Sequence, residues 1–272
     1  MIHNILYYNG SKINYQCEGK GETTLVLLHG FMHDLRIWAP FVYSYMREIR
    51  VVTIDLPGHG ESECCDEVHT MELQADVVKA VLDELGIKKC VMAGHSMGGY
   101  VALAFAARYS DYLRGLCLVN SHALADGVQK AEDRRRMCRI VKENRAGFII
   151  NFIPQLFAEC NRDSLDEEIK DLQDYALNTG TKGIIAAQEG MITRKSHVDV
   201  LQNSNFPVLF IAGREDKRIS VDLVIAQASL APHCEIMLLP NVAHMSHVEA
   251  KNIVKQRLLS FVRMCFSMVS PL

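Results

Sequence analysis

Short runs of apolar residues alternate along the chain with longer stretches in which apolar side chains recur every three or four positions. Eight of the runs are predicted to be strands: 4–8, 13–17, 24–29, 51–55, 90–94, 115–120, 207–213 and 235–239. Most are continuously apolar, a pattern typical of strands buried on both faces of a parallel sheet. The first two differ, because Asn9-Gly10 between them favours a tight antiparallel hairpin, which we expect at the sheet edge.

The stretches between the strands have the periodicity of amphipathic helices. In the stretch that starts at Thr70, side chains such as Leu73, Val77 and Val81 fall on one face, and Gly86 follows the last turn. Threonine is a favoured N-cap and glycine a common C-terminal stop, so this helix is predicted with both of its ends. Further helices are predicted at 100–110 and 248–266. Strands alternating with helices indicate right-handed βαβ units in a doubly wound α/β sheet.

The alternation stops near residue 121 and resumes near residue 207. The intervening sequence is helical in character, without an apolar run of the strand type. We therefore predict that residues 122–203 form a helical cap inserted over one edge of the sheet, while residues 1–121 and 204–272 together form the α/β core.

The composition is that of an ordinary globular domain, with 272 residues, 49% hydrophobic residues and a formal net charge of −3. This charge gives no electrostatic reason to expect nucleic acid or an anionic membrane surface as a partner. The only basic cluster, RRRMCR at 134–139, is predicted to be a solvated helix face. No stretch approaches the roughly 18 apolar residues of a membrane-spanning helix.

Nine cysteines are scattered through the chain in an odd number and without a CxxC pair. Several lie inside apolar runs, where a free thiol behaves as a small hydrophobic residue. The N-terminal sequence MIHNILYYNG does not have the basic and apolar regions of a signal peptide. We predict a soluble cytoplasmic protein without a disulfide framework.

Reactive side chains follow the carboxyl ends of three predicted strands, where α/β sheets collect functional groups. Ser96 stands in GHSMGG, between an apolar run and a helix, so a sharp turn would expose its hydroxyl at a helix N-terminus. A serine hydroxyl needs a base and an orienting carboxylate to act as a nucleophile. Asp216 and His244 follow later strands in the order Ser, acid, His. The alternatives are a turn or N-cap role for Ser96, Glu215 or Asp222 as the acid, and His247 as the base.

Five segments resemble the α/β-hydrolase-fold serine hydrolase superfamily over almost the entire chain: LVLLHGF, TIDLPGHGES, GHSMGGYVAL, VLFIAGREDKRI and NVAHMSHVEA. Within it, the chain is similar to the small capped esterases, enol-lactonases and carbon–carbon hydrolases. The resemblance implies an α/β-hydrolase fold, with a mostly parallel eight-stranded sheet flanked by helices. It also implies the roles of nucleophile for Ser96, acid for Asp216 and base for His244. The backbone N–H groups of Phe31 and Met97 are implied to form the oxyanion hole.

Departures from related patterns narrow the reaction type. Proline does not follow His29-Gly30, and serine rather than aspartate occupies the nucleophile position, which disfavours epoxide hydrolases and haloalkane dehalogenases. Asp55 precedes Ser96 and is interpreted as a structural turn residue. Asn120, at another strand end, cannot carry the acid's charge, and Glu249, five residues after His244, matches the family pattern.

We therefore predict a serine hydrolase that cleaves a carboxylic ester or lactone of a small molecule through an acyl-enzyme, without a metal or organic cofactor. Met32, Trp38 and Phe152 are candidates for the substrate pocket, although core packing explains them equally well. Carbon–carbon or thioester hydrolysis by the same triad stays open, as does a catalytically idle binding protein. Monomer and homodimer are both compatible with the sequence.

Overall fold

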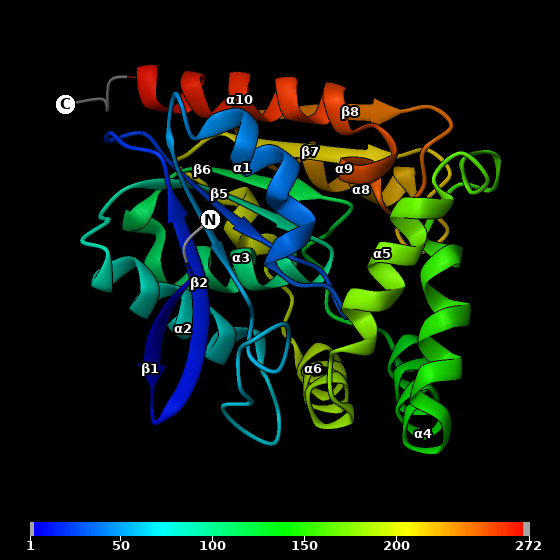
Figure 1. Cartoon of the computed structure of the whole chain (residues 1–272). Helices are drawn as coiled ribbons and strands as arrows, with labels where there is room; N and C mark the ends of the chain where they lie inside the picture. The colour runs from blue at the N-terminus through cyan, green and yellow to red at the C-terminus, as the bar shows by residue number, and fades with distance from the viewer. Residues whose placement is uncertain (1–2, 269–272) are drawn as a thin grey trace.

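Eight strands form one sheet in the computed structural model, which describes residues 3–268 (Figure 1). The strands are β1 (Asn4–Tyr8), β2 (Ser11–Glu18), β3 (Thr24–Leu28), β4 (Arg50–Ile54), β5 (Cys90–His95), β6 (Leu113–Val119), β7 (Val208–Gly213) and β8 (Cys234–Leu239). Their order is β1-β2-β4-β3-β5-β6-β7-β8. All eight overlap the predicted runs, so the predicted α/β sheet is confirmed.

Only β2 runs against its neighbours, so β1–β2 and β2–β4 are antiparallel and all other pairs are parallel. Asn9 and Gly10 both have positive φ, 48° and 85°, as a two-residue hairpin turn requires. The predicted hairpin at the sheet edge is therefore confirmed. Every residue of β3, β5 and β7 is buried, which explains why these runs are continuously apolar.

Helices cover both faces of the sheet. They are α1 (Ala39–Tyr45), α2 (Met71–Glu84), α3 (Met97–Tyr109), α4 (Val128–Phe152), α5 (Asp166–Leu177), α6 (Thr181–Thr193), α7 (Val198–Gln202), α8 (Val221–Ala228), α9 (Ser246–Glu249) and α10 (Lys251–Ser267), with short 3₁₀ helices at Leu35–Trp38, Ser110–Tyr112, Ile153–Leu156 and Glu159–Asn161. Figure 1 shows α1 and α10 on one face and α2 and α3 on the other. The Thr70 hydroxyl accepts a hydrogen bond from the Leu73 N–H, as its N-cap position predicts.

Helices α4 to α7 fill the chain between β6 and β7. In Figure 1, α4 and α5 lie beyond the end of the sheet toward which β7 and β8 point. The α4 helix is interrupted at Asn144, whose φ of −149° and ψ of 77° are not helical. The Asn144 side chain accepts the Gly147 N–H at 2.9 Å and so caps the second half of α4. The division into a core and a cap stays a prediction.

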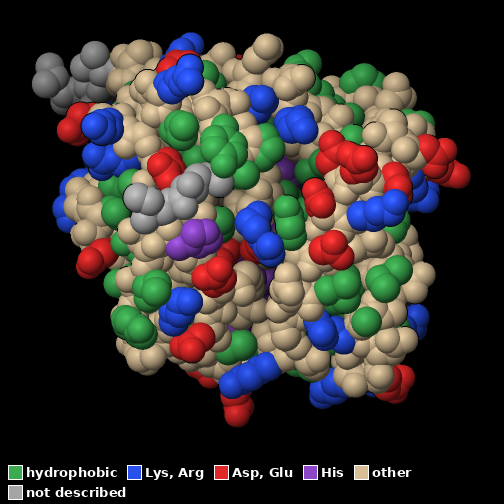
Figure 2. All heavy atoms as spheres, viewed as in Figure 1, with side chains coloured by type: hydrophobic (Ala, Val, Ile, Leu, Met, Phe, Trp, Pro, Cys, Tyr) green, Lys and Arg blue, Asp and Glu red, His purple; other side chains and the backbone are tan. Residues whose placement is uncertain are grey.

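Length and apolarity decide whether any of the helices in residues 3–268 could span a bilayer. None of the helices there is both long and apolar enough to cross a bilayer. Acidic and basic side chains are interspersed over the face seen in Figure 2.

Candidate active site

Ser96 occupies the single position between β5 and α3, and its backbone is strained. Its φ of 50° and ψ of −112° are rare for a residue with a side chain. The turn is so tight that a Cβ on Gly94 would lie 2.2 Å from the Gly98 carbonyl oxygen, and one on Gly98 would lie 2.5 Å from that of Leu28. The Ser96 hydroxyl makes no capping hydrogen bond to α3, so it is available for other partners.

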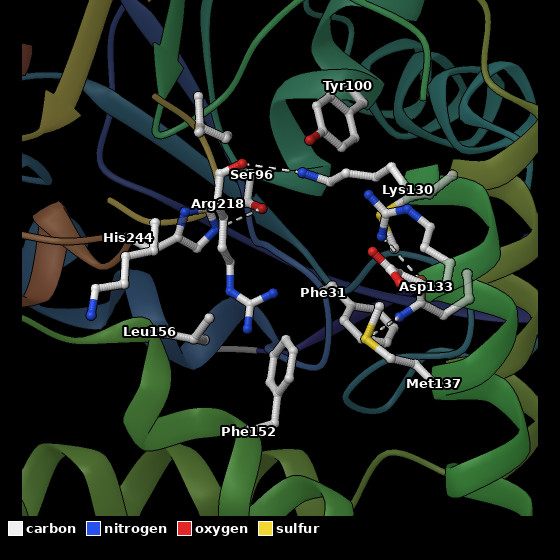
Figure 3. A pocket seen from close by; sticks show the side chains of 15 residues that line it. Phe31, Ser96, Tyr100, Lys130, Asp133, Met137, Phe152, Leu156, Arg218 and His244 are labelled. Atoms are coloured by element: carbon white, nitrogen blue, oxygen red, sulfur yellow. Dashed lines mark hydrogen bonds between the residues drawn. The ribbon is translucent and has the colours of Figure 1, made fainter. Parts of the chain in front are cut away.

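Ser96, His244 and Asp216 form a continuous chain of hydrogen bonds, of which Figure 3 shows the one between Ser96 and His244. The Ser96 Oγ lies 2.9 Å from His244 Nε2, and His244 Nδ1 lies 2.8 Å from Asp216 Oδ2. With the imidazole proton on Nδ1, Nε2 is free to accept the serine proton. Asp216 and His244 are 7% and 5% exposed. The structure thus brings together the three residues expected to act as nucleophile, acid and base.

The carboxylate of Asp216 is held in its ionised form. Burial alone would raise its pKa, but the neighbouring His244 and several hydrogen bonds outweigh burial and lower the pKa to about 2. Two of these bonds come from the backbone N–H groups of Arg218 and Ile219 to Oδ1, at 2.8 and 3.2 Å. A third comes from Asn120 Nδ2 to Oδ2, at 3.0 Å. The carboxylate is therefore charged and oriented before any substrate binds.

Asn120 is a site residue that the sequence does not predict, because an asparagine cannot serve as the acid. It follows β6 with a φ of 45°. Its amide nitrogen donates to Asp216 and to the Ala243 carbonyl at 3.0 Å, and its amide oxygen accepts from the Ser246 hydroxyl. Asn120 therefore ties the acid to the loop that carries His244. The sequence signal for this role is a polar amide side chain directly after a buried strand, at the edge of the sheet where the other site residues lie.

The backbone of His244 is fixed on both sides. Its N–H donates to the Leu156 carbonyl, and its own carbonyl accepts from His95 Nε2, both at 2.9 Å. Glu249 fixes the same loop, because one carboxylate oxygen accepts the Ala243 N–H at 2.9 Å. These hydrogen bonds fix the position of the imidazole through the backbone and leave both of its ring nitrogens for Ser96 and Asp216.

Glu249 also connects the His244 loop to the segment after α4. Its second carboxylate oxygen accepts the Ala158 N–H and the Asn161 side-chain N–H, each at 2.9 Å. The glutamate expected from the family pattern thus bridges the core and the inserted helices.

His247, the alternative base, lies in the core, and neither of its buried ring nitrogens has a hydrogen-bond partner among the described residues. It is 1% exposed, and its ring packs 4.7 Å from Trp38 and 4.3 Å from His95. Burial, followed by the nearby His95, holds the pKa of His247 well below its ordinary value. Although His33, His95, His244 and His247 lie close together, no group of three His, Cys, Asp or Glu residues in the described range could hold a metal ion.

The residues expected to form the oxyanion hole, Met97 and Phe31, both lie near Ser96. Met97 is the first residue of α3, where an N–H has no partner within the helix. Phe31 follows Gly30, and a Cβ on Gly30 would lie 2.5 Å from His95 Nδ1, so only glycine lets this loop approach the turn at Ser96. Phe31 and Ser96 line the same cavity. Their role as an oxyanion hole stays a prediction.

A cavity of about 340 Å³ opens in front of Ser96 and His244. Phe152 from α4 lines it, as do Tyr100 and Met191. Met32 and Trp38 do not line it, contrary to the prediction: both are 0% exposed in the core. Trp38 ends a 3₁₀ helix and packs edge-to-face on Phe41, at 5.2 Å between ring centroids.

The prediction that the basic run at 134–139 is a solvated helix face is only partly correct. Arg134 is 7% exposed and points inward, and its guanidinium binds the Asp126 carboxylate and, at 3.0 Å, the Gln188 side-chain oxygen. Arg135, Arg136 and Arg139 are exposed as expected.

Comparison with known proteins identifies the fold family. Residues 23–251 match the family model described as alpha/beta hydrolase fold. An esterase from Thermogutta terrifontis, solved with malate bound, is 30% identical with a TM-score of 0.91, covering 97% of this chain and 99% of that chain. The enol-lactonase from Burkholderia xenovorans shares the fold, with a TM-score of 0.88 at 22% identity, over 96% of this chain and 100% of that one.

Curated relatives include enzymes with different reactions. A 2-hydroxy-6-oxononadienedioate/2-hydroxy-6-oxononatrienedioate hydrolase from Paraburkholderia phymatum is 26% identical over 92% of this chain and 91% of its own length. The dihydrolipoyllysine-residue acetyltransferase component of the acetoin cleaving system from Pseudomonas putida is 30% identical over 92% of this chain. The chain spans 66% of that protein and 64% of its Cupriavidus necator counterpart. By its family match over most of its length, its eight-stranded sheet and its strand order, the chain belongs to the alpha/beta hydrolase fold family.

Proposed function

We propose that the protein is a serine hydrolase that cleaves a carboxylic ester or lactone of a small molecule through an acyl-enzyme intermediate. The observation that carries this proposal is the hydrogen-bonded chain Ser96–His244–Asp216 at the wall of a cavity. The Thermogutta terrifontis esterase, similar over nearly the whole of both chains, supports the same reaction type.

In the proposed mechanism, Ser96 Oγ attacks the substrate carbonyl while His244 Nε2 takes its proton. The charged Asp216 stabilises the imidazolium that forms. The N–H groups of Phe31 and Met97 bind the oxyanion, a contribution of about 10²–10³ in rate for each donor. His244 then protonates the leaving alcohol and activates water, which releases the acid and restores Ser96.

Labelling with a fluorophosphonate tests the nucleophile. We expect the wild type to be labelled and Ser96→Ala to lose the label, because the probe reacts with activated serines. Ser121→Ala is the matched control, since Ser121 lies near the turn and donates to the Ser96 carbonyl oxygen at 2.8 Å. Labelling that persists in Ser96→Ala would refute the assignment.

Hydrolysis of p-nitrophenyl acetate tests the base. His244→Ala is expected to reduce kcat by about 10⁴-fold or more, as removal of a triad member does. His247→Ala removes a core ring and is expected to lower thermal stability more than kcat. A larger loss of kcat in His247→Ala would show that the base is wrongly assigned.

Carbon–carbon and thioester hydrolysis are second candidates for the same triad. The Paraburkholderia phymatum relative favours the first of these. A panel of ester, lactone, thioester and vinylogous diketone substrates ranks the reactions by kcat/KM. An idle binding protein is disfavoured, because all three triad side chains are present and hydrogen-bonded. An alkyl-enzyme route is disfavoured too, because it uses a carboxylate nucleophile and the chain has Ser96.

A further inference from the structure

The cavity beside Ser96 has more basic than acidic groups in its wall. Four basic residues line it, Lys130, Arg134, Lys217 and Arg218, whereas Asp133 is the one acidic lining residue within the described chain. Asp133 is exposed and accepts a weak hydrogen bond from Gln129 at 3.3 Å. The overall charge of the protein is negative, so this local excess is a property of the cavity and not of the whole surface.

Arg218 is one of two basic lining residues, with Lys217, that directly follow Asp216 in the chain. Figure 3 shows its side chain extending from beside Ser96 and His244 toward Phe152. The guanidinium carbon lies 4.3 Å from the centre of the Phe152 ring. No Asp or Glu of the described residues forms an ion pair with the guanidinium, and its buried Nε has no hydrogen-bond partner. Asp216 accepts from the Arg218 backbone instead.

Lys130 reaches the same region from α4. Its Nζ donates to the Arg218 carbonyl oxygen at 3.1 Å, and Figure 3 shows the ammonium directed toward Ser96. An ammonium has three N–H donors, so this bond leaves two of them for a ligand. Although the Lys130 side chain is exposed, desolvation by the surrounding atoms and then the charge of Arg134 lower its pKa. A bound anion would relieve this repulsion.

The charged groups behind Lys130 do not neutralise the excess positive charge of the cavity. The buried carboxylate of Asp126 is shared by two guanidinium groups, that of Arg134 and, at 2.8 Å, that of Arg194. Two cations on one carboxylate leave one positive charge. The Arg194 guanidinium lies 4.0 Å from the ring centre of Tyr100, which itself lines the cavity.

We propose that the substrate carries a carboxylate, which Arg218 and Lys130 bind next to the scissile bond, so that the enzyme prefers half-esters or lactones of dicarboxylic acids. A guanidinium and an ammonium that form no ion pair within the described residues are matched to a carboxylate, since charge-assisted hydrogen bonds are the strongest available there. Phe152 supplies an apolar surface for the carbon chain between the two functional groups. This inference rests on the proposed ester hydrolysis for its reaction, but not for its binding site.

Binding without catalysis is measured first, by calorimetry on Ser96→Ala with glutarate and with neutral glutaramide. Glutarate is expected to bind at least about tenfold more tightly, because one charge-assisted hydrogen bond contributes that much. The preference is expected to disappear when Arg218→Gln is added. Equal binding of the two compounds, or a preference that survives Arg218→Gln together with Lys130→Gln, would overturn the proposal.

Kinetics then compare a charged ester with a neutral ester of the same length on each side of the bond. The acyl-side pair is mono-p-nitrophenyl glutarate and p-nitrophenyl valerate, and the alcohol-side pair is 4-carboxyphenyl valerate and phenyl valerate. In one of the two pairs, Arg218→Gln and Lys130→Gln are each expected to lower the kcat/KM ratio of charged to neutral ester by about 10- to 100-fold. Arg139→Gln removes the same charge from an exposed position on α4 and is expected to leave both ratios unchanged.

The two proposals fail in different ways. If glutarate binds through Arg218 but no ester is cleaved, the hydrolase proposal fails and the carboxylate site stands. If neutral esters are cleaved and neither charged ester is preferred, the hydrolase proposal stands and the carboxylate site is refuted.

Discussion

At the scale of the residue, Asn120 is an uncharged side chain that fixes the position of a charged one, the carboxylate of Asp216. Its amide group joins the Asp216 carboxylate to the backbone of Ala243, the residue before the proposed base. The geometry of acid and base relative to each other therefore depends on one planar group. Alanine at this position would leave the carboxylate with one hydrogen bond fewer and the loop without its anchor.

We predict that Asn120→Ala lowers kcat on p-nitrophenyl acetate by about 10- to 100-fold, the effect of one lost hydrogen bond to a charged group. KM is expected to change much less, since Asn120 is not among the residues that line the cavity. Asn120→Asp adds a like charge that raises the pKa of Asp216, so the acidic limb of the pH–rate profile is expected to move to higher pH. Wild-type kcat in Asn120→Ala would contradict this role.

The residues at strand ends could be predicted from the sequence, and those in irregular segments could not. Ser96, Asp216 and His244 each follow an apolar run, and parallel strands bring such positions to one edge of the sheet. Met32 and Trp38 lie in a loop and a 3₁₀ helix, where no strand or helix period sets the direction of a side chain. Both are apolar, and the core accommodates them. The inward turn of Arg134 depends on Asp126, eight residues away, which helical spacing does not indicate.

At the scale of the element, the contact between α3 and β3 leaves no room for a side chain. Gly98 lies in the first turn of α3, where alanine would ordinarily stabilise a helix by about 1 kcal/mol. Here a Cβ would lie 2.5 Å from the Leu28 carbonyl oxygen and 2.6 Å from that of His29. Because these are backbone atoms of a buried strand end, they cannot move aside without displacing the strand or the turn.

We therefore expect Gly98→Ala to reduce the free energy of unfolding by about 2 kcal/mol or more, as overpacked core substitutions do. Urea unfolding followed by circular dichroism measures the change. Gly127→Ala is the matched control, because Gly127 has a negative φ and open space around its Cβ position, and its expected cost is below about 1 kcal/mol. Equal effects of the two substitutions would show that the close approach is not limiting.

The strands were predictable because their signals are local, and the inserted helices were predictable only as a block. Apolar runs, Asn9-Gly10 and Thr70 each act over a few residues. The break in α4 depends on Asn144, an exposed residue without a neighbouring proline, and the packing of α4, α5 and α6 depends on contacts between separate segments. The composition of this stretch indicates helices but not where they bend.

Over the whole molecule, several histidines are buried in the neutral state. Burial is the main cause that lowers the pKa of His59, His95 and His122 to about 3 and that of His69 to about 4. In the unfolded chain these rings titrate near pH 6.5. Below that pH the unfolded state binds more protons than the native state, so stability is complete above about pH 6.5 and falls as the pH decreases.

We predict that each of these histidines removes about 1 kcal/mol of stability between pH 7 and pH 5.5, so together they remove a large part of a typical folding free energy. Urea unfolding at pH 7.5, 6.5 and 5.5 measures the dependence. His122→Gln is expected to make stability fall less steeply with decreasing pH, whereas His233→Gln, at an exposed position, is expected to leave the slope unaltered. Stability that does not change between pH 7.5 and 5.5 would contradict the prediction.

The hydrogen bond from the His244 N–H to the Leu156 carbonyl has a mechanical consequence. Leu156 belongs to the 3₁₀ helix that follows α4, and Glu249 fastens the next residues to the same loop through Ala158. The segment that forms this wall of the cavity and the loop that carries the imidazole are thus joined by hydrogen bonds and are expected to move together. If this wall moved away from the sheet to admit a substrate, the hydrogen bond to His244 would lengthen. The imidazole would then be held in its catalytic orientation only when the wall lies against the sheet.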